Sequence, residues 1–131
     1  MNRPILPILL PLALLTTTVL LSAIGCDDAT KKSAAAMTGG NPDRGGQLIG
    51  YYGCGACHEI PGIHGADGLV GPPLARIAER TYVGGVIQNT PQNIVRWIQN
   101  PPGIDPMTAM PNLHVTPADA RDIAGYLYTL R

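Results

Sequence analysis

The chain of 131 residues has few aromatic side chains and no excess of either charge. Phenylalanine is absent, and tyrosine and tryptophan together make up 5% of the sequence, so the chain supplies little of the bulk from which a large core is built. Nine Lys and Arg residues balance nine Asp and Glu residues, and the longest basic run is Lys31-Lys32. Nucleic-acid binding depends on a concentrated positive surface, so we expect no nucleic-acid partner.

Glycine and proline are abundant instead. The 16 glycines and 13 prolines indicate many loops but stay below the fraction that is typical of low-complexity disorder. A chain of this length holds one small domain at most. We therefore expect a compact fold made of short elements.

Residues 1–25 have the pattern of an export signal. A short start that includes Arg3 is followed by an almost wholly apolar stretch from Ile5 to Ile24. A permanent transmembrane helix is the alternative, because about 20 apolar residues can cross a bilayer. Three prolines between residues 4 and 11 would each remove helix hydrogen bonds, and they favour the signal. Either interpretation places the rest of the chain outside the cytoplasm.

The residues that follow indicate how the mature protein is anchored. Ala23-Ile24-Gly25-Cys26 resembles the lipobox of bacterial lipoproteins, which implies that Cys26 is acylated and becomes the first mature residue. A free or disulfide-forming thiol is the alternative for Cys26. Residues 26–40 are rich in small and polar side chains without apolar periodicity, so we expect a flexible tether there. The folded domain would then occupy residues 41–131.

The strongest motif in the sequence is Cys54-Gly55-Ala56-Cys57-His58. A C-x-x-C-H run is the signature of covalent haem c attachment. Thiols at this spacing can reach two vinyl-derived carbons on one edge of a porphyrin, and the adjacent His58 is delivered to the iron from the same turn. A bound porphyrin would also supply the wide apolar surface that the chain's few aromatic residues do not.

Two other chemistries use closely spaced cysteines. A dithiol redox pair also has a C-x-x-C motif, but it has no need of His58 and follows a strand in an alternating β/α pattern, which this sequence does not show. A zinc site would need further ligands, and the remaining candidates are His64, His114 and acidic residues. Covalent attachment of one haem c is the interpretation that uses the whole motif.

The chain from about Asn41 to Leu130 resembles the class I cytochromes c. These are small monohaem proteins with a C-x-x-C-H motif near the N-terminus and a methionine ligand near the C-terminus. The resemblance implies an all-α fold in which short helices and loops pack around one covalently attached haem c.

Two helices are expected at the ends of this domain. Asp43–Gly53 looks like the family's first helix, with Asn41 as a plausible N-cap. Thr116–Leu130 has one apolar face and begins with a capping threonine. The resemblance implies that Tyr126 of the last helix packs over the Gly45-Gly46 pair of the first.

The resemblance also implies two residues that act around the axial histidine. Gly71-Pro72-Pro73-Leu74 resembles a family loop in which the carbonyl of Pro72 would accept the Nδ1–H of His58, fix its orientation and make it a better donor to iron. A simple turn is the alternative. Arg80 lies where family members often carry an arginine directed at a haem propionate, and a solvated surface arginine is the alternative there.

A third helix is expected before the second iron ligand. Gln92–Gln99 has apolar faces and ends before Pro101-Pro102. By resemblance, Trp97 of this helix points toward the haem pocket.

Met107 and Met110 both follow this helix, and only one of them can be the sixth ligand of the iron. The family's spacing from the preceding helix and to the last one fits Met110, and Pro111 favours an extended conformation there. Met107 is then a loop or surface residue. His64 and His114 are the candidates for the alternative of two histidine ligands.

A histidine and a methionine ligand leave no open coordination position, and thioether ligation raises the reduction potential. The resemblance therefore implies an electron-transfer protein and not an enzyme. We expect it to be lipid-anchored on the periplasmic side of a bacterial membrane, or in the periplasm, as part of a respiratory chain.

The expected redox partners are a membrane quinol-oxidising complex or a periplasmic dehydrogenase on one side and a terminal oxidase or reductase on the other. The docking surface would be the haem edge near Gly55, Ala56 and residues 60–63. Two alternatives remain: a fixed subunit of a larger oxidase or dehydrogenase, and a haem peroxidase or gas-binding protein with a labile Met110.

Overall fold

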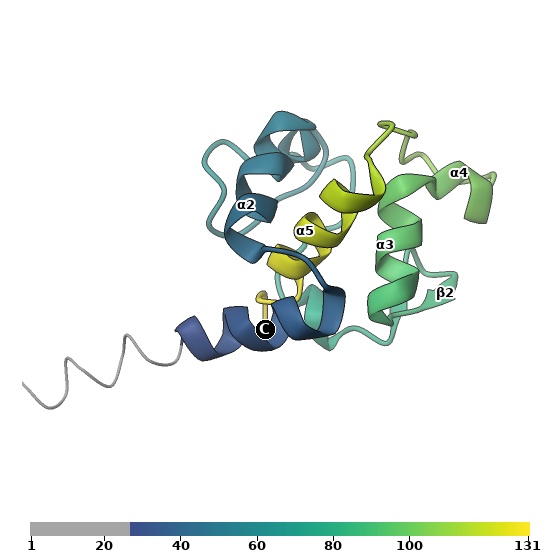
Figure 1. Cartoon of the computed structure of the whole chain (residues 1–131). Helices are drawn as coiled ribbons and strands as arrows, with labels where there is room; N and C mark the ends of the chain where they lie inside the picture. Colours follow the sequence, from purple (N-terminus) through teal and green to yellow (C-terminus); the bar gives the residue numbers. More distant parts are fainter. Residues whose placement is uncertain (1–26) are drawn as a thin grey trace, which may run out of the picture. The chain divides into compact units, whose positions relative to one another are not determined.

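The computed structural model describes residues 27–131. The compact unit Lys31–Arg131 contains every labelled element that follows. In chain order these are α2 (Pro42–Tyr51), two 3-10 turns (Cys54–Ala56 and Ile77–Glu79), β1 (Tyr82–Val83), β2 (Ile87–Gln88), α3 (Pro91–Gln99), α4 (Pro101–Ile104) and α5 (Pro117–Leu127) (Figure 1). The predicted all-α class is confirmed, since the two antiparallel strands form only a short hairpin.

Helices α2, α3 and α5 each begin at a polar cap that is followed directly by a proline. Oδ1 of Asn41 accepts the backbone N–H groups of Asp43 and Arg44 at 3.0 and 3.2 Å. The hydroxyls of Thr90 and Thr116 each accept the N–H three residues further on, both at 3.2 Å. These bonds satisfy N–H groups that have no partner within the helix. The predicted caps Asn41 and Thr116 are therefore confirmed.

The helices end earlier than the sequence suggested. Helix α2 stops at Tyr51, because Gly53 adopts a left-handed conformation with φ 71° that starts the next turn. Helix α5 stops at Leu127, and Thr129 folds back so that its hydroxyl donates to the Tyr126 carbonyl at 2.6 Å. Helix α3 does end before Pro101 as predicted, but that proline opens α4, which the sequence did not indicate.

Helix α5 lies between α2 and α3 and contacts both (Figure 1). A Cβ added at Gly45 would overlap the backbone carbonyl of Asp122, so the two helices approach as closely as their backbones allow. A Cβ at Gly46 would lie 3.1 Å from the ring of Tyr126. The expectation that Tyr126 covers both glycines is thus corrected, because Gly46 meets the ring and Gly45 meets the backbone.

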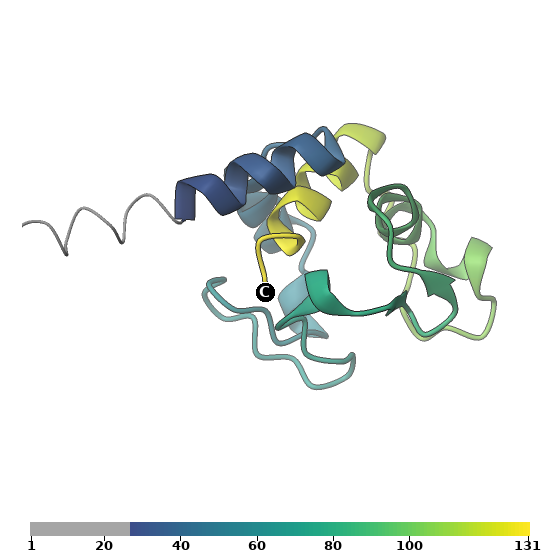
Figure 2. The same cartoon turned by 90° about the horizontal axis from the view of Figure 1, so that it is seen from below.

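The segment expected to be a flexible tether is helical over residues 27–38. Ala34 is fully buried, and the hydroxyl of buried Thr38 donates to the Ala34 carbonyl at 2.9 Å. Thr38 also lies against Gly125, and residues 31–38 run beside α5 (Figure 2). Small residues one helical turn apart make this contact, which is why no large-residue periodicity marked the helix in the sequence.

The buried core is a single cluster of mainly aliphatic side chains. Trp97 and Tyr128 are its aromatic members, at 7% and 6% exposure. The composition had predicted such a core, with few aromatic residues to fill it. Among residues 27–131, no helix is both long enough and apolar enough to cross a bilayer.

Candidate functional site

A cavity of about 550 Å³ opens between α5, α3 and the loops that follow α2 and α4. Its walls are largely aliphatic, and they come from segments far apart in the sequence: the end of α2, the segment of residues 70–85, helix α3, the segment of residues 108–115 and the inner face of α5. All three residues of the C-x-x-C-H motif that carry chemistry line it, together with Pro72, Arg80, Trp97 and Met110. The structure thus brings every predicted haem-site residue to one cavity.

The two motif cysteines lie on a 3-10 turn directly after α2. The N–H groups of Cys57 and His58 both donate to the Cys54 carbonyl, at 3.2 and 3.0 Å. Neither Cys54 nor Cys57 forms a disulfide. Burial raises the pKa of the Cys54 thiol, the opposite of what activates a redox-active dithiol. This environment does not fit the thioredoxin-type alternative.

The imidazole of His58 is held from one side by the loop that follows the motif. Nδ1 lies 2.8 Å from the carbonyl oxygen of Pro72, which can only accept, so Nδ1 carries the proton. Nε2 is left as the lone-pair nitrogen. Gly71 packs against the ring near Cε1 so closely that a Cβ there would overlap it, and its N–H donates to the Cys57 carbonyl at 2.7 Å. The histidine therefore has one tautomer and one orientation.

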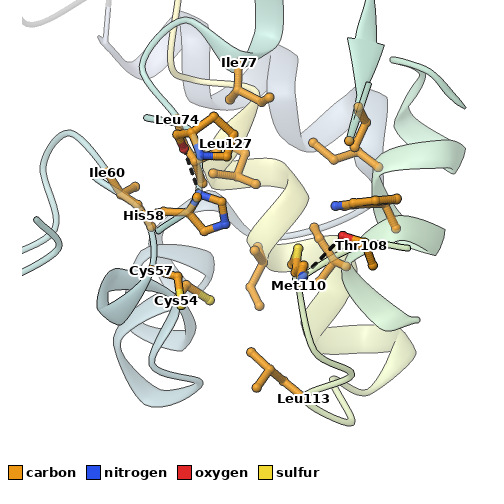
Figure 3. A pocket seen from close by; sticks show the side chains of 18 of the residues that line it. Cys54, Cys57, His58, Ile60, Leu74, Ile77, Thr108, Met110, Leu113 and Leu127 are labelled. Atoms are coloured by element: carbon orange, nitrogen blue, oxygen red, sulfur yellow. Dashed lines mark hydrogen bonds between the residues drawn. The ribbon is translucent and has the colours of Figure 1, made fainter. Parts of the chain in front are cut away.

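Met110 enters the cavity from the other side. Figure 3 shows the side chains of His58 and Met110 facing each other across the space, with Cys54 and Cys57 at its edge. The N–H of Met110 donates to the hydroxyl of Thr108 at 3.2 Å, a bond drawn in Figure 3. An imidazole nitrogen and a thioether sulfur thus face the cavity from opposite walls.

The competing ligands do not line the cavity. Met107 is 90% exposed, and His64 and His114 are exposed as well. Within residues 27–131, no group of three or more His, Cys, Asp or Glu side chains is arranged to hold a metal ion. The zinc alternative therefore has no ligand set in this part of the chain.

Arg80 and Trp97 occupy the wall next to the hairpin. Nη2 of Arg80 donates to the carbonyls of Pro73 and Ala75, the latter at 3.1 Å, so its guanidinium is held against the loop in this structure. Its predicted contact with a haem propionate stays a prediction. The indole of Trp97 lies against Gly84, where φ is 59° and a Cβ would overlap the ring. Glycine is required there for both reasons.

Sequence reasoning missed two parts of this site. The hairpin contributes Tyr82 and Val83 to the wall, and no strand was predicted from the sequence. Thr108 was also missed. Its position two residues before Met110, with a hydroxyl able to accept the Met110 N–H, is a short-range signal typical of threonine turns.

A family model described as Cytochrome c matches residues 42–131. The chain belongs to the cytochrome c family. Neither the curated proteins nor the solved structures contain a match to it. Members of this family bind haem c covalently and transfer electrons, so the predicted class I cytochrome c fold and the haem c cofactor are confirmed.

The cavity of this cytochrome suits that cofactor. Its volume of about 550 Å³ lies within the range of cofactor pockets. Its walls are apolar, two thiols stand at one edge, and one imidazole nitrogen and one thioether face its interior from opposite sides. These are the donors that hold a haem in His/Met cytochromes.

Proposed function

We propose that Cys54 and Cys57 attach one haem c and that Nε2 of His58 and the sulfur of Met110 ligate its iron. The observation that carries this proposal is that His58 and Met110, the imidazole and the thioether among the described lining residues, face one cavity from opposite walls. When bound, the haem supplies a one-electron couple between Fe(III) and Fe(II).

The surrounding residues prepare this site for electron transfer. The Pro72 carbonyl accepts a hydrogen bond from Nδ1–H of His58 at 2.8 Å, which makes Nε2 a stronger electron donor to the iron. The aliphatic wall that includes Ile94 and Ile98 keeps water out and lowers the local dielectric. A thioether ligand raises the potential relative to a second imidazole. We therefore place this cytochrome in the upper potential range of a respiratory chain.

A carrier is favoured over a peroxidase or a gas-binding protein. Those functions need an open coordination position, and peroxide chemistry needs a distal acid or base as well. Among the described lining residues Arg80 carries the charged side chain, and its Nη2 already donates to two backbone carbonyls. Asp105 and Asp119 do not line the cavity. The proposed function is accordingly not enzymatic.

The anchor and the location are part of the same proposal. Residues 1–25 would be the export signal, and Cys26 would carry the lipid; both lie outside the described residues. The protein would then sit on the periplasmic side of a bacterial membrane. Anchoring would raise its effective concentration near membrane partners. Those partners would be a quinol-oxidising complex or a dehydrogenase and a terminal oxidase or reductase.

One residue of the docking surface expected from the sequence is buried. Ile60 is only 2% exposed, so it cannot contact a partner. On the same loop, Leu69 and Val70 are 86% and 77% exposed, and Val70 reaches the cavity wall. We therefore propose that a partner contacts Leu69 and Val70 together with exposed Ala56. A fixed subunit of a larger complex would use the same surface, and copurification after mild detergent extraction would distinguish it from a mobile carrier.

The ligand assignment is tested by optical spectra of the ferric and ferrous holoprotein. We expect a low-spin ferric spectrum with the weak long-wavelength band of iron–methionine ligation. Met110→Ala should lose this band, while Met107→Ala, which alters an exposed residue outside the cavity, should keep it. Loss of the band in Met107→Ala alone, or its absence from the wild type, would contradict the assignment.

A further inference from the structure

A single hydrogen bond connects the segment that carries Met110 to the rest of the domain. The other hydrogen bonds of residues 106–115 in the described chain are local, and each joins residues no more than three apart, such as Met110 and Thr108. The exception runs from Nδ2 of Asn112 to Oδ1 of Asn100, at 3.3 Å. Apart from apolar contacts, this bond is what holds the segment in place.

Asn112 also sets the backbone on its C-terminal side. Its Oδ1 accepts the N–H of His114 at 2.8 Å, and His114 has φ 55°. Residues other than glycine adopt this left-handed conformation rarely, and an asparagine side chain that accepts the N–H two residues on stabilises such a turn. After that turn, Val115 is buried at 6% exposure. The Asn112 side chain therefore donates through Nδ2 to Asn100 and accepts through Oδ1 from His114.

The other partner, Asn100, is itself firmly placed. Its N–H donates to the Arg96 carbonyl at 3.1 Å and closes α3, while its Oδ1 accepts the Gly103 N–H at 3.2 Å and caps α4. The next residue, Pro101, is almost completely buried. Asn100 is thus a fixed point at the junction of two helices, to which the segment carrying Met110 is bonded.

We propose that Asn112, through its bond to Asn100, is a positioning residue that keeps the Met110 side chain in the cavity. Only Pro111 separates the two, and its ring fixes φ, so a displacement of Asn112 is passed on to Met110. This inference rests on the proposed role of Met110 as an iron ligand. The Asn112–Asn100 bond would keep low the population of ferric protein in which the Met110 thioether has left the iron.

Asn112→Asp isolates this bond. The carboxylate keeps an acceptor for the His114 N–H, but it cannot donate to Asn100 and places a negative charge beside Oδ1 of that residue. Asn112→Ser, which keeps a hydroxyl acceptor, is the second variant if the first does not accumulate with haem attached. Asn93→Ala is the matched control, because it removes an asparagine side chain of α3 that bonds elsewhere, to the Gln88 carbonyl at 2.9 Å.

The measurement is cyanide affinity of the full-length ferric holoprotein, followed by titration. Cyanide takes the position that Met110 vacates, so its apparent affinity rises with the population of the displaced state. Removal of one hydrogen bond should tighten cyanide binding by about three- to tenfold in Asn112→Asp. On warming, the long-wavelength band of this variant should weaken at a lower temperature than that of the wild type. Asn93→Ala should match the wild type in both.

Wild-type cyanide affinity in Asn112→Asp, or in Asn112→Ser where that variant is needed, would overturn the positioning role. An equal change in Asn93→Ala would overturn it too, because it would reflect a general loosening of the domain. Met110→Ala distinguishes an error in the ligand assignment from an error in the positioning role. If it keeps the long-wavelength band, the ligand assignment is wrong; if it loses the band while Asn112→Asp behaves as the wild type, only the positioning role is wrong.

Discussion

The hydroxyl of Tyr52 donates a hydrogen bond to Oδ2 of Asp119 at 2.8 Å and thereby joins the end of α2 to the first turn of α5. Oδ1 of the same carboxylate pairs with Arg44 at 2.5 Å, and Arg44 also pairs with Asp122. These contacts link the same two helices that meet at Gly45. The polar group therefore reinforces the crossing that supports one wall of the haem cavity.

This carboxylate makes stability depend on pH in the acid range. Hydrogen bonds from Tyr52, then from Thr116 and Arg44, lower the pKa of Asp119 below its ordinary value of 3.8, although partial burial opposes them. A carboxyl whose pKa is lowered by folding stabilises the fold above its ordinary pKa, and that stabilisation is lost as the pH falls through the lower folded value. Asp119→Asn should therefore be less stable than the wild type at pH 7, and the difference should shrink below about pH 3.8.

Urea unfolding of both proteins at pH 7 and pH 3 checks this prediction. Asp67→Asn is the matched control, since the exposed Asp67 side chain makes no hydrogen bond or ion pair in the described chain. A difference between wild type and Asp119→Asn that stays constant between the two pH values would contradict the role given to the Asp119 charge.

Gly71→Ala should disturb the axial histidine directly. The added methyl group would overlap the His58 ring, and the backbone of residue 71 is tied to the Cys57 carbonyl, so the imidazole must move. We expect a loss of about 1–3 kcal/mol in the unfolding free energy of the holoprotein, as for other overpacked sites, together with a shifted reduction potential. Denaturant titration and potentiometry measure the two effects. An unchanged potential would show that Gly71 does not orient His58.

Gly45→Ala and Gly50→Ala test the helix crossing with the same chemical change in one helix. At Gly45 the methyl group meets the Asp122 carbonyl, whereas at Gly50 it meets open space. We expect Gly45→Ala to destabilise the fold by about 1–3 kcal/mol and Gly50→Ala to stabilise it by up to about 1 kcal/mol through helix propensity. Thermal unfolding of both variants decides the matter. Similar effects at the two positions would contradict a backbone contact at Gly45.

Asn41→Ala should remove the N-cap of α2. Two N–H groups, those of Asp43 and Arg44, would lose their acceptor, which costs about 1 kcal/mol. Asn41→Asp keeps a side-chain acceptor and should lie close to the wild type in the same urea titration. Equal destabilisation of the two variants would contradict the capping role of the Asn41 side chain, because both keep the backbone N–H that donates to Asp122 at 2.7 Å.

Much of the fold and of the candidate site follows from local chemistry. Asn41 and Thr116 cap helices because their oxygen atoms lie within reach of N–H groups two or three residues away, and this depends only on neighbouring sequence. The spacing of Cys54, Cys57 and His58 likewise belongs to one turn. Such features can be read before any tertiary contact is known.

Other features depend on distant parts of the chain. Helical residues such as Ala34 and Thr38 are small, so nothing in their own segment marks them as buried; the approach of α5 decides it. Ile60 and Leu69 are equally apolar, yet Ile60 is buried and Leu69 is exposed. The loop folds back so that the Ile60 N–H donates to the Ala66 carbonyl, and Leu69 lies beyond this contact. The exposure of Leu69 could therefore not be predicted from composition.

The haem-attachment motif and the caps Asn41 and Thr116 follow from the sequence alone, because each arises from residues within a turn of one another. Three other features depend on how the helices pack: Asn112 bonds to Asn100, Tyr52 and Arg44 share Asp119, and Gly45 lies against the Asp122 carbonyl. The physical reason is the range of the interactions. Hydrogen bonds and close packing act over a few ångströms, and these partners become neighbours only when the helices have packed together.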